Sequence, residues 1–135
     1  MSTYKEMRGD IPVEIFLPYQ AANTTGGVSW YVPWNLTITS ASLIPSAAIT
    51  ANGTNYLTVS FFNRGAAGAG TTQWATARSY AAGNSVKATA ETLTLSSTAA
   101  DLNLTAGDVV QIEITPTASG LIWPGGTVYL VTRRR

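Results

Sequence analysis

The chain has 135 residues, a formal net charge of +1 at pH 7 and only 11% charged residues, and it contains neither histidine nor cysteine. These two residue types most often transfer protons, attack substrates or bind transition metals near neutral pH. Their absence excludes disulfides and thiol chemistry, and a net charge of +1 argues against general binding to nucleic acid. We therefore expect a protein without catalytic residues, without a bound metal and without a cofactor.

The length predicts one domain with a hydrophobic core. No apolar run reaches the roughly 20 residues of a membrane helix, and the N-terminal residues lack the apolar segment of a signal peptide. We expect a protein that is made in the cytoplasm and has no membrane partner. The low charge has two interpretations: threonine suits exposed strand positions, or the surface is one that neighbouring subunits cover.

Residues 1–10 are polar and are predicted to form an N-terminal arm. We select Tyr4, Lys5 and Arg8 in this arm as candidate contacts with a partner. The β-domain is predicted to follow over residues 11–132.

Strand patterns begin at residues 13–17, where prolines on both sides predict an edge strand. Further strands are predicted at residues 28–34, 36–45, 55–63, 71–80, 86–95, 109–114 and 127–132. The apolar positions change phase near Ser40, which predicts a β-bulge. About eight short strands separated by turn residues predict an all-β, single-domain β-sandwich, either jelly-roll or immunoglobulin-like, with an N-terminal arm.

The glycine-rich residues 64–70 lie between two predicted strands, which favours a hairpin loop over a phosphate-binding loop. The carboxylates are scattered along the chain, whereas a glycosidase needs two that face each other across a cleft. The carboxylates therefore give little support to a hydrolase.

Large aromatic side chains could form a sugar-binding platform, fill the core or line a subunit contact. They are Trp30, Tyr31, Trp34, Trp74, Tyr80 and Trp123. Trp30 and Tyr31 point to opposite faces of one predicted strand, so at least one lies outside the core. We select Trp30 and Trp34 as candidate partner contacts.

The chain closes on Arg133, Arg134 and Arg135, which form a basic C-terminal tail. Such a tail is either a solvated terminus or an anchor that contacts nucleic acid or an acidic protein surface. We include the three arginines among the candidate partner contacts and leave both interpretations open.

Several turns and strand phases between residues 36 and 131 form a familiar combination. They are found at residues 43–49, 54–59, 63–65, 68–72, 93–95, 106–109 and 124–128. This combination resembles small head proteins of tailed bacteriophages that decorate and stabilise the capsid.

The resemblance implies a β-sandwich module that binds the major capsid protein on the outside of the expanded head. It also implies a homotrimer at a threefold position, production in the host cytoplasm, a place on the virion surface, and no catalytic residues. The arm and the edge strand are natural contacts for strand addition to a neighbour.

The leading hypothesis is therefore a non-enzymatic structural protein of the virion, without a specific nucleic-acid partner. The alternative is a carbohydrate- or receptor-binding module of a phage fibre or head appendage, which needs exposed aromatic residues. A third hypothesis is a hydrolase with two facing carboxylates.

Overall fold

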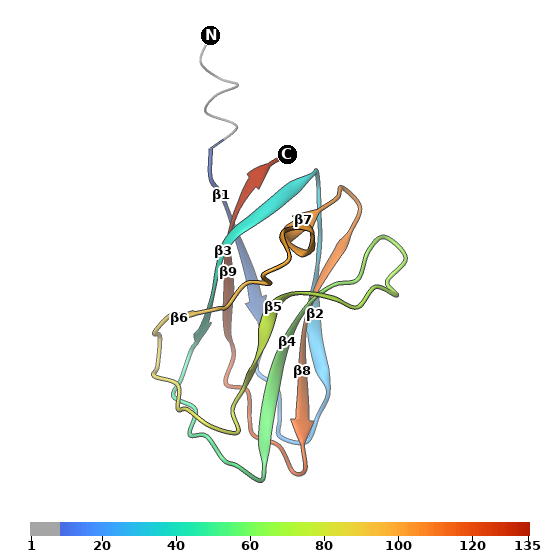
Figure 1. The fold of residues 1–135 in the computed structure, drawn as a ribbon. Helices are drawn as coiled ribbons and strands as arrows, with labels where there is room; N and C mark the ends of the chain where they lie inside the picture. The colour runs from blue at the N-terminus through green and yellow to red at the C-terminus, as the bar shows by residue number, and fades with distance from the viewer. Residues whose placement is uncertain (1–8) are drawn as a thin grey trace.

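Two antiparallel sheets pack face to face in the computed structural model, which describes residues 9–135 (Figure 1). The first sheet has the order β1 (Ile11–Leu17), β9 (Gly126–Arg134), β3 (Leu36–Pro45) and β6 (Glu91–Thr92), and β7 (Asn103–Leu104) also pairs with β3. The second sheet has the order β2 (Gly26–Tyr31), β8 (Val109–Thr117), β4 (Tyr56–Asn63) and β5 (Thr72–Ser79). The predicted β-sandwich is confirmed.

The strand order identifies the topology as a jelly roll. β1 pairs with β9, β2 with β8, β3 with β6, and β4 with β5. The first half of the chain therefore runs antiparallel to the second half, as in one long hairpin rolled into two sheets. One 3₁₀ turn, η1 (Ala99–Leu102), stands between β6 and β7. Residues 9–135 contain no helix long and apolar enough to cross a membrane.

The core lies between the sheets and is built by period-two alternation. In β8 the buried residues are Val110, Ile112 and Ile114, while Gln111 and Glu113 between them are only partly covered. The same alternation continues in β4, where Phe61 is buried. Its ring lies 5.2 Å from the ring of Trp74 on β5, so aromatic packing joins these two strands.

The predicted bulge in β3 is confirmed. The pairing of β3 with β9 shifts between Ile38 and Ser40. The extra residue, Thr39, donates a hydrogen bond from its hydroxyl to the carbonyl of Val131 (3.0 Å). The shift allows the residues on both sides of the bulge to face the core, although their sequence phases differ.

The segment predicted as a strand at residues 86–95 forms a ladder only at Glu91–Thr92. Beyond it, the amide of Leu93 donates to Ala41 in the first sheet, and the amide of Ser96 donates to Trp74 in the second. A segment that passes from one sheet to the other cannot remain in a single ladder. This crossing joins the two sheets along the β3 and β5 side.

The other two edges of the sandwich, β1 and β2, have no further strand beside them in residues 9–135. The prediction that residues 13–17 form an edge strand is confirmed. At the C-terminus, β9 runs to Arg134, two residues past the expected end of the domain at Thr132.

Candidate docking surfaces

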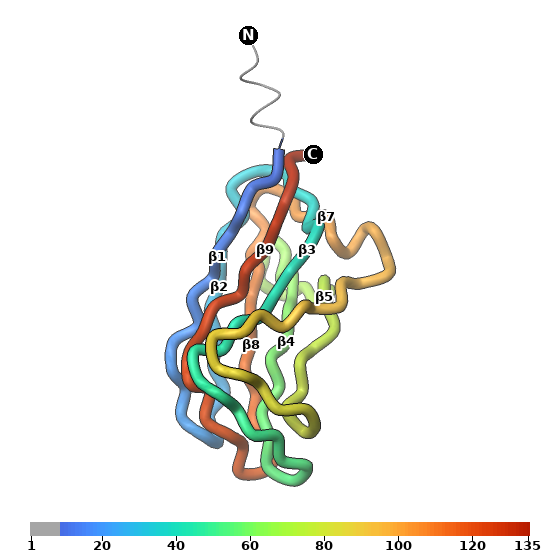
Figure 2. Tube along the Cα trace, turned by 90° about the vertical axis from the view of Figure 1, so that its left-hand side faces the viewer, coloured from blue at the N-terminus to red at the C-terminus, as the bar shows by residue number. Residues whose placement is uncertain are grey.

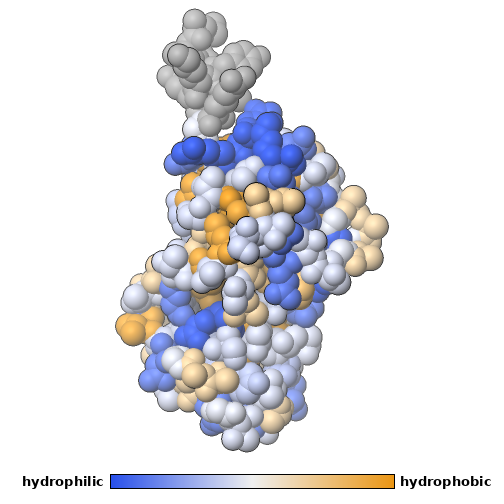
Figure 3. All heavy atoms as spheres, in the orientation of Figure 1, coloured by the Kyte–Doolittle hydropathy of each residue, from blue (hydrophilic) through white to orange (hydrophobic). Residues whose placement is uncertain are grey.

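One end of the sandwich gathers residues that lie far apart in the sequence. Trp34 belongs to the connection that leads from β2 in the second sheet to β3 in the first. Asp10 directly precedes β1. β9 ends at the same place, as Figures 1 and 2 show. We call Asp10, Trp34 and residues 133–135 the terminal end. Figure 3 shows hydrophilic residues concentrated where the C-terminus lies.

Each of the three arginines at the terminal end is held in a different way. The Nε of Arg133 donates to Oδ1 of Asp10 (2.7 Å), and the guanidinium carbon of Arg134 lies 4.9 Å from the centre of the Trp34 ring. Arg135 donates from Nε to the carbonyl of Leu36 (3.1 Å) and from Nη2 to that of Leu104 (3.0 Å). The basic tail is therefore attached to the sandwich.

The other sequence-based candidates are not at the terminal end. Trp30 is half-buried and packs against the core from the inner side of β2. Tyr4, Lys5 and Arg8 lie outside the described residues.

The six aromatic residues do not form one platform. Trp74, Tyr80 and Trp123 are completely buried, whereas Tyr31 and Trp34 are 68% and 41% exposed. Of the six, Tyr31 and Trp34 are therefore the ones most available for sugar stacking on a free surface, and Trp34 already contacts Arg134.

A second candidate surface is the outer face of the first sheet, which Figure 2 shows from the front. Away from the terminal end, its outward residues come into register across β1, β9 and β3; they are Pro12, Glu14, Phe16, Ser40, Ser42, Ile44, Thr127, Tyr129 and Val131. Glu14 is the only charged residue among them, and Phe16 is 70% exposed. We call this surface the outer face of the first sheet.

Sequence analysis missed this surface. The available signal was the run of Thr127, Tyr129 and Val131, three successive outward positions of the last strand that carry no charge before Arg133 at the terminal end. In the second sheet an ion pair lies in the middle of the outer face, between Arg64 and Glu113 of β8 (3.5 Å), whereas the pair of the first sheet, Arg133 with Asp10, lies at the terminal end.

Five of the six carboxylates of residues 9–135 are bound to separate partners, and the sixth, Glu14, is exposed on β1. Asp10, Glu91 and Glu113 each pair with a different arginine. Asp101 accepts a hydrogen bond from the Ser96 hydroxyl, and Asp108 accepts from the backbone of Thr105 and the side chain of Asn63. Each of these five carboxylates is therefore engaged by a partner of its own, whereas a carboxylate hydrolase needs two that face each other across a cleft.

A cluster of Arg78, Tyr80, Ser85 and Glu91 contains a serine hydroxyl beside a carboxylate. The Nε of Arg78 donates to Oε1 of Glu91 (2.6 Å), and the hydroxyls of Tyr80 and Ser85 both contact Oε2. Arg78 also donates to three carbonyl groups of the turn between residues 79 and 83. These bonds occupy the carboxylate and tie β5 to β6, so we assign the cluster a stabilising role.

The same cluster predicts a loss of stability at high pH. Burial raises the pKa of Tyr80 to about 12, against about 10 for an unfolded chain. Between these values the unfolded chain releases the phenol proton and the folded protein keeps it. The contribution of neutral Tyr80 to the free energy of unfolding is therefore complete below pH 10, and it is lost as the pH rises toward 12. Each pH unit in that window lowers the free energy of unfolding by up to about 1.4 kcal/mol.

Urea unfolding at pH 9 and pH 11 checks this prediction. Tyr80→Phe has no phenol proton, so its free energy of unfolding should fall less than that of the wild type between the two pH values. An equal fall in both proteins would show that Tyr80 does not carry the effect.

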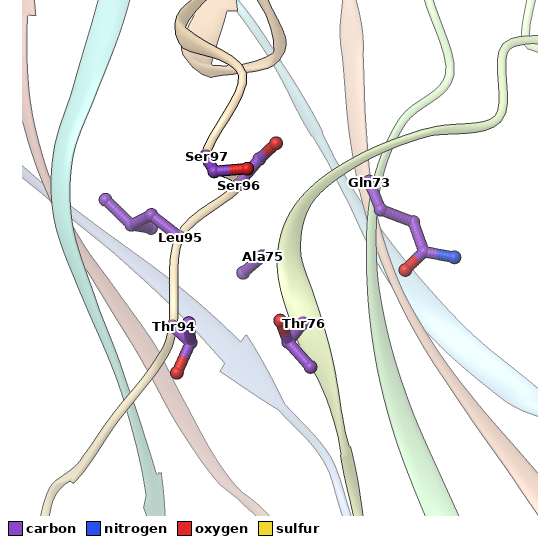
Figure 4. A pocket seen from close by; sticks show the side chains of 7 residues that line it. All are labelled: Gln73, Ala75, Thr76, Thr94, Leu95, Ser96 and Ser97. Carbon is purple, nitrogen blue, oxygen red and sulfur yellow. The ribbon is translucent and has the colours of Figure 1, made fainter.

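Two open depressions lie on the sandwich, and neither is lined by an ionisable side chain. The first, of about 340 Å³, is formed between β5 and the crossing segment by Gln73, Ala75, Thr76, Thr94, Leu95, Ser96 and Ser97 (Figure 4). The second, of about 400 Å³, is lined by Ala22, Ala48, Ile49, Thr50, Gly120, Leu121 and Ile122. The first offers hydroxyl groups, the Gln73 amide and apolar contacts, and the second offers apolar contacts and the Thr50 hydroxyl.

Comparisons with protein-family models, with curated proteins and with solved structures give no match for this chain.

Proposed function

We propose that this protein is a non-enzymatic structural protein of a tailed-bacteriophage virion, which binds the outer surface of the capsid and stabilises the expanded head. The observation that carries the proposal is the outer face of the first sheet, where Glu14 is the only charge away from the terminal end and Phe16 is exposed at the edge. A face with few charges loses little hydration when another protein covers it.

The jelly-roll topology is compatible with this role, because viral capsid domains use it. Lectin domains use it as well, and a fold alone does not define a function. The turn and strand phases that resemble phage decoration proteins are the reason for preferring the capsid.

The proposed partner is the major capsid protein. A subunit that contacts neighbouring capsomers binds the assembled shell better than separated capsomers, and this difference in affinity stabilises the shell. The protein would be made in the host cytoplasm and would act on the capsid surface.

We propose a homotrimer at the threefold positions of the shell. The edge of β2 suits a contact between subunits, because Gly26–Tyr31 contains neither a proline nor a charge that would block strand addition. The edge of β1 is better protected, since it contains Pro12 and Glu14.

The alternative function is a carbohydrate- or receptor-binding module. The exposed rings of Tyr31 and Trp34 favour it. Binding to a glycan array that is lost in Trp34→Ala would support this alternative. A glycan array without any signal would exclude a carbohydrate-binding function.

Heating of expanded heads tests the proposed function. Addition of the purified protein to heads that lack it should raise the temperature at which the heads release their DNA. The rise should saturate at a fixed number of copies per head. Heads that release DNA at the same temperature at every protein concentration would contradict the proposal.

Deletion of residues 1–10 should weaken binding to heads by about tenfold or more and leave the domain folded. The only described interaction of a side chain that the deletion removes is the exposed ion pair between Asp10 and Arg133. Exposed pairs contribute at most about 1 kcal/mol to stability. Thermal unfolding and occupancy on heads measure the two effects, and unchanged occupancy would exclude a contact by the arm.

A further inference from the structure

We propose that the terminal end binds an acidic segment of a partner protein, with the guanidinium groups of Arg134 and Arg135 receiving its carboxylates. This inference deepens the proposed function, because it names the chemistry of the segment on which the protein docks.

The distribution of charge points to this site. Arg64, Arg78 and Arg133 form ion pairs within residues 9–135. The remaining cations of this part of the chain are Lys87, Arg134 and Arg135, and none of them has a carboxylate at ion-pair distance there. Two of these three uncompensated charges are adjacent in sequence and belong to the terminal end.

Arg134 is arranged to accept a carboxylate. Its guanidinium lies over the Trp34 ring, which occupies one face of the group. The N–H groups of a guanidinium lie in its plane, and a carboxylate binds there with two parallel hydrogen bonds, so stacking on the ring does not block this mode of binding. The contact with Trp34 also restricts the side chain before binding, so less conformational entropy is lost on association.

Arg135 keeps its charge although it is hydrogen-bonded. Its partners are the carbonyls of Leu36 and Leu104 and, at 3.4 Å, the hydroxyl of Thr105, all of which are neutral. Its Nη1 makes no hydrogen bond within residues 9–135 and can donate to an incoming carboxylate. Asp108 accepts from the amide of Thr105 (2.9 Å) and weakens the positive potential on that side, so Arg134 should dominate.

An acidic protein segment fits this site better than nucleic acid. Nucleic-acid affinity grows with the number of phosphates neutralised, and proteins that bind it well use about 6–10 such contacts. The terminal end offers two uncompensated arginines beside each other. Arg134 also lies over the Trp34 ring, where a base would otherwise stack.

Fluorescence anisotropy with a labelled oligoglutamate peptide at low salt tests the inference, with a short DNA duplex as the second probe. We expect Arg134→Glu to weaken peptide binding at least tenfold. Lys87→Glu makes the same change of charge at an exposed residue of the loop before β6, and we expect a change below twofold. Arg134→Lys should give an intermediate affinity, because an ammonium cannot form the paired hydrogen bonds.

The inference is overturned if the wild type does not bind the peptide, if the two glutamate variants weaken binding equally, or if DNA binds more tightly than the peptide. If Arg134→Glu unfolds at the same temperature as the wild type, a loss of binding is a local effect. If that variant does not fold, chemical-shift mapping of the peptide on the wild type shows whether it binds at the terminal end.

Binding to heads separates this inference from the proposed function. If the wild type and Arg134→Glu occupy heads equally, the docking segment lies elsewhere and the inference fails, while the proposed function stands. If the wild type does not bind heads, the proposed function fails, and the peptide titration still decides whether the terminal end recognises acidic protein.

Discussion

Trp74→Ala is expected to lower the free energy of unfolding by about 3–5 kcal/mol. The side chain is completely buried on β5, and its ring packs against Phe61 of β4 at a tilt of 53°. Truncation leaves a cavity at the point where the edge strand of the second sheet joins the core. Since the chain has no cysteine, and therefore no disulfide that would compensate, the loss should appear fully in urea unfolding.

Two further variants serve as controls for this prediction. The indole Nε1 of Trp74 has no hydrogen-bond partner within residues 9–135. Trp74→Phe removes that unsatisfied group and keeps most of the apolar area, so its loss should be below about 2 kcal/mol. Val86→Ala alters an exposed side chain and should change stability by less than about 0.5 kcal/mol. A loss below about 1 kcal/mol for Trp74→Ala would contradict the packing of β5 against β4.

Glu91→Ala is expected to cost about 2–4 kcal/mol of stability. The substitution leaves the guanidinium of Arg78 without its carboxylate, and it removes the acceptor that the hydroxyls of Tyr80 and Ser85 share. The side chains of Arg78 and Glu91 are only 19% and 23% exposed, so water replaces the lost partner poorly.

Glu113→Ala provides the matched control. Glu113 pairs with Arg64 at similar exposure, 29% and 19%, but the contact is longer, 3.5 Å against 2.6 Å, and no hydroxyl shares the carboxylate. We expect a loss of about 1 kcal/mol for this variant.

A double-mutant cycle of Arg78→Ala and Glu91→Ala should give a coupling energy of about 1–3 kcal/mol. Chemical denaturation of the three variants measures it. Additive effects, or equal losses for Glu91→Ala and Glu113→Ala, would show that the cluster does not act as a unit.

Local signals in the sequence predict much of the sandwich. The alternation in β4 and β8 indicates which residues are buried, and the change of phase near Ser40 marks the bulge. The prolines around residues 13–17 indicate the edge position of β1. Each of these features depends on residues that are neighbours along one strand.

The strand order could not be predicted in the same way. The sequence was compatible with a jelly roll and with an immunoglobulin-like sandwich, because the pairs β1–β9 and β2–β8 join opposite ends of the chain. The pairing of residues 86–95 could not be predicted from the sequence either. Leu93 and Leu95 alternate as in a strand, but the hydrogen bonds of this segment are divided between two sheets.

The terminal end could be predicted only in part. The three arginines and Trp34 were identified from the sequence, but the contact between Trp34 and Arg134 depends on the end of β9 lying beside the β2–β3 connection. For the same reason the sequence left open whether the basic tail is attached. The outer face of the first sheet arises only when β1, β9 and β3 stand in register.

Co-sedimentation with phage heads tests the central claim most directly. The purified protein is mixed with expanded heads that lack it, and with unassembled major capsid protein as a control. We predict saturable binding to the expanded heads and much weaker binding to the unassembled subunits. A protein that remains in the supernatant at every head concentration would contradict the claim that this sandwich docks on a viral shell.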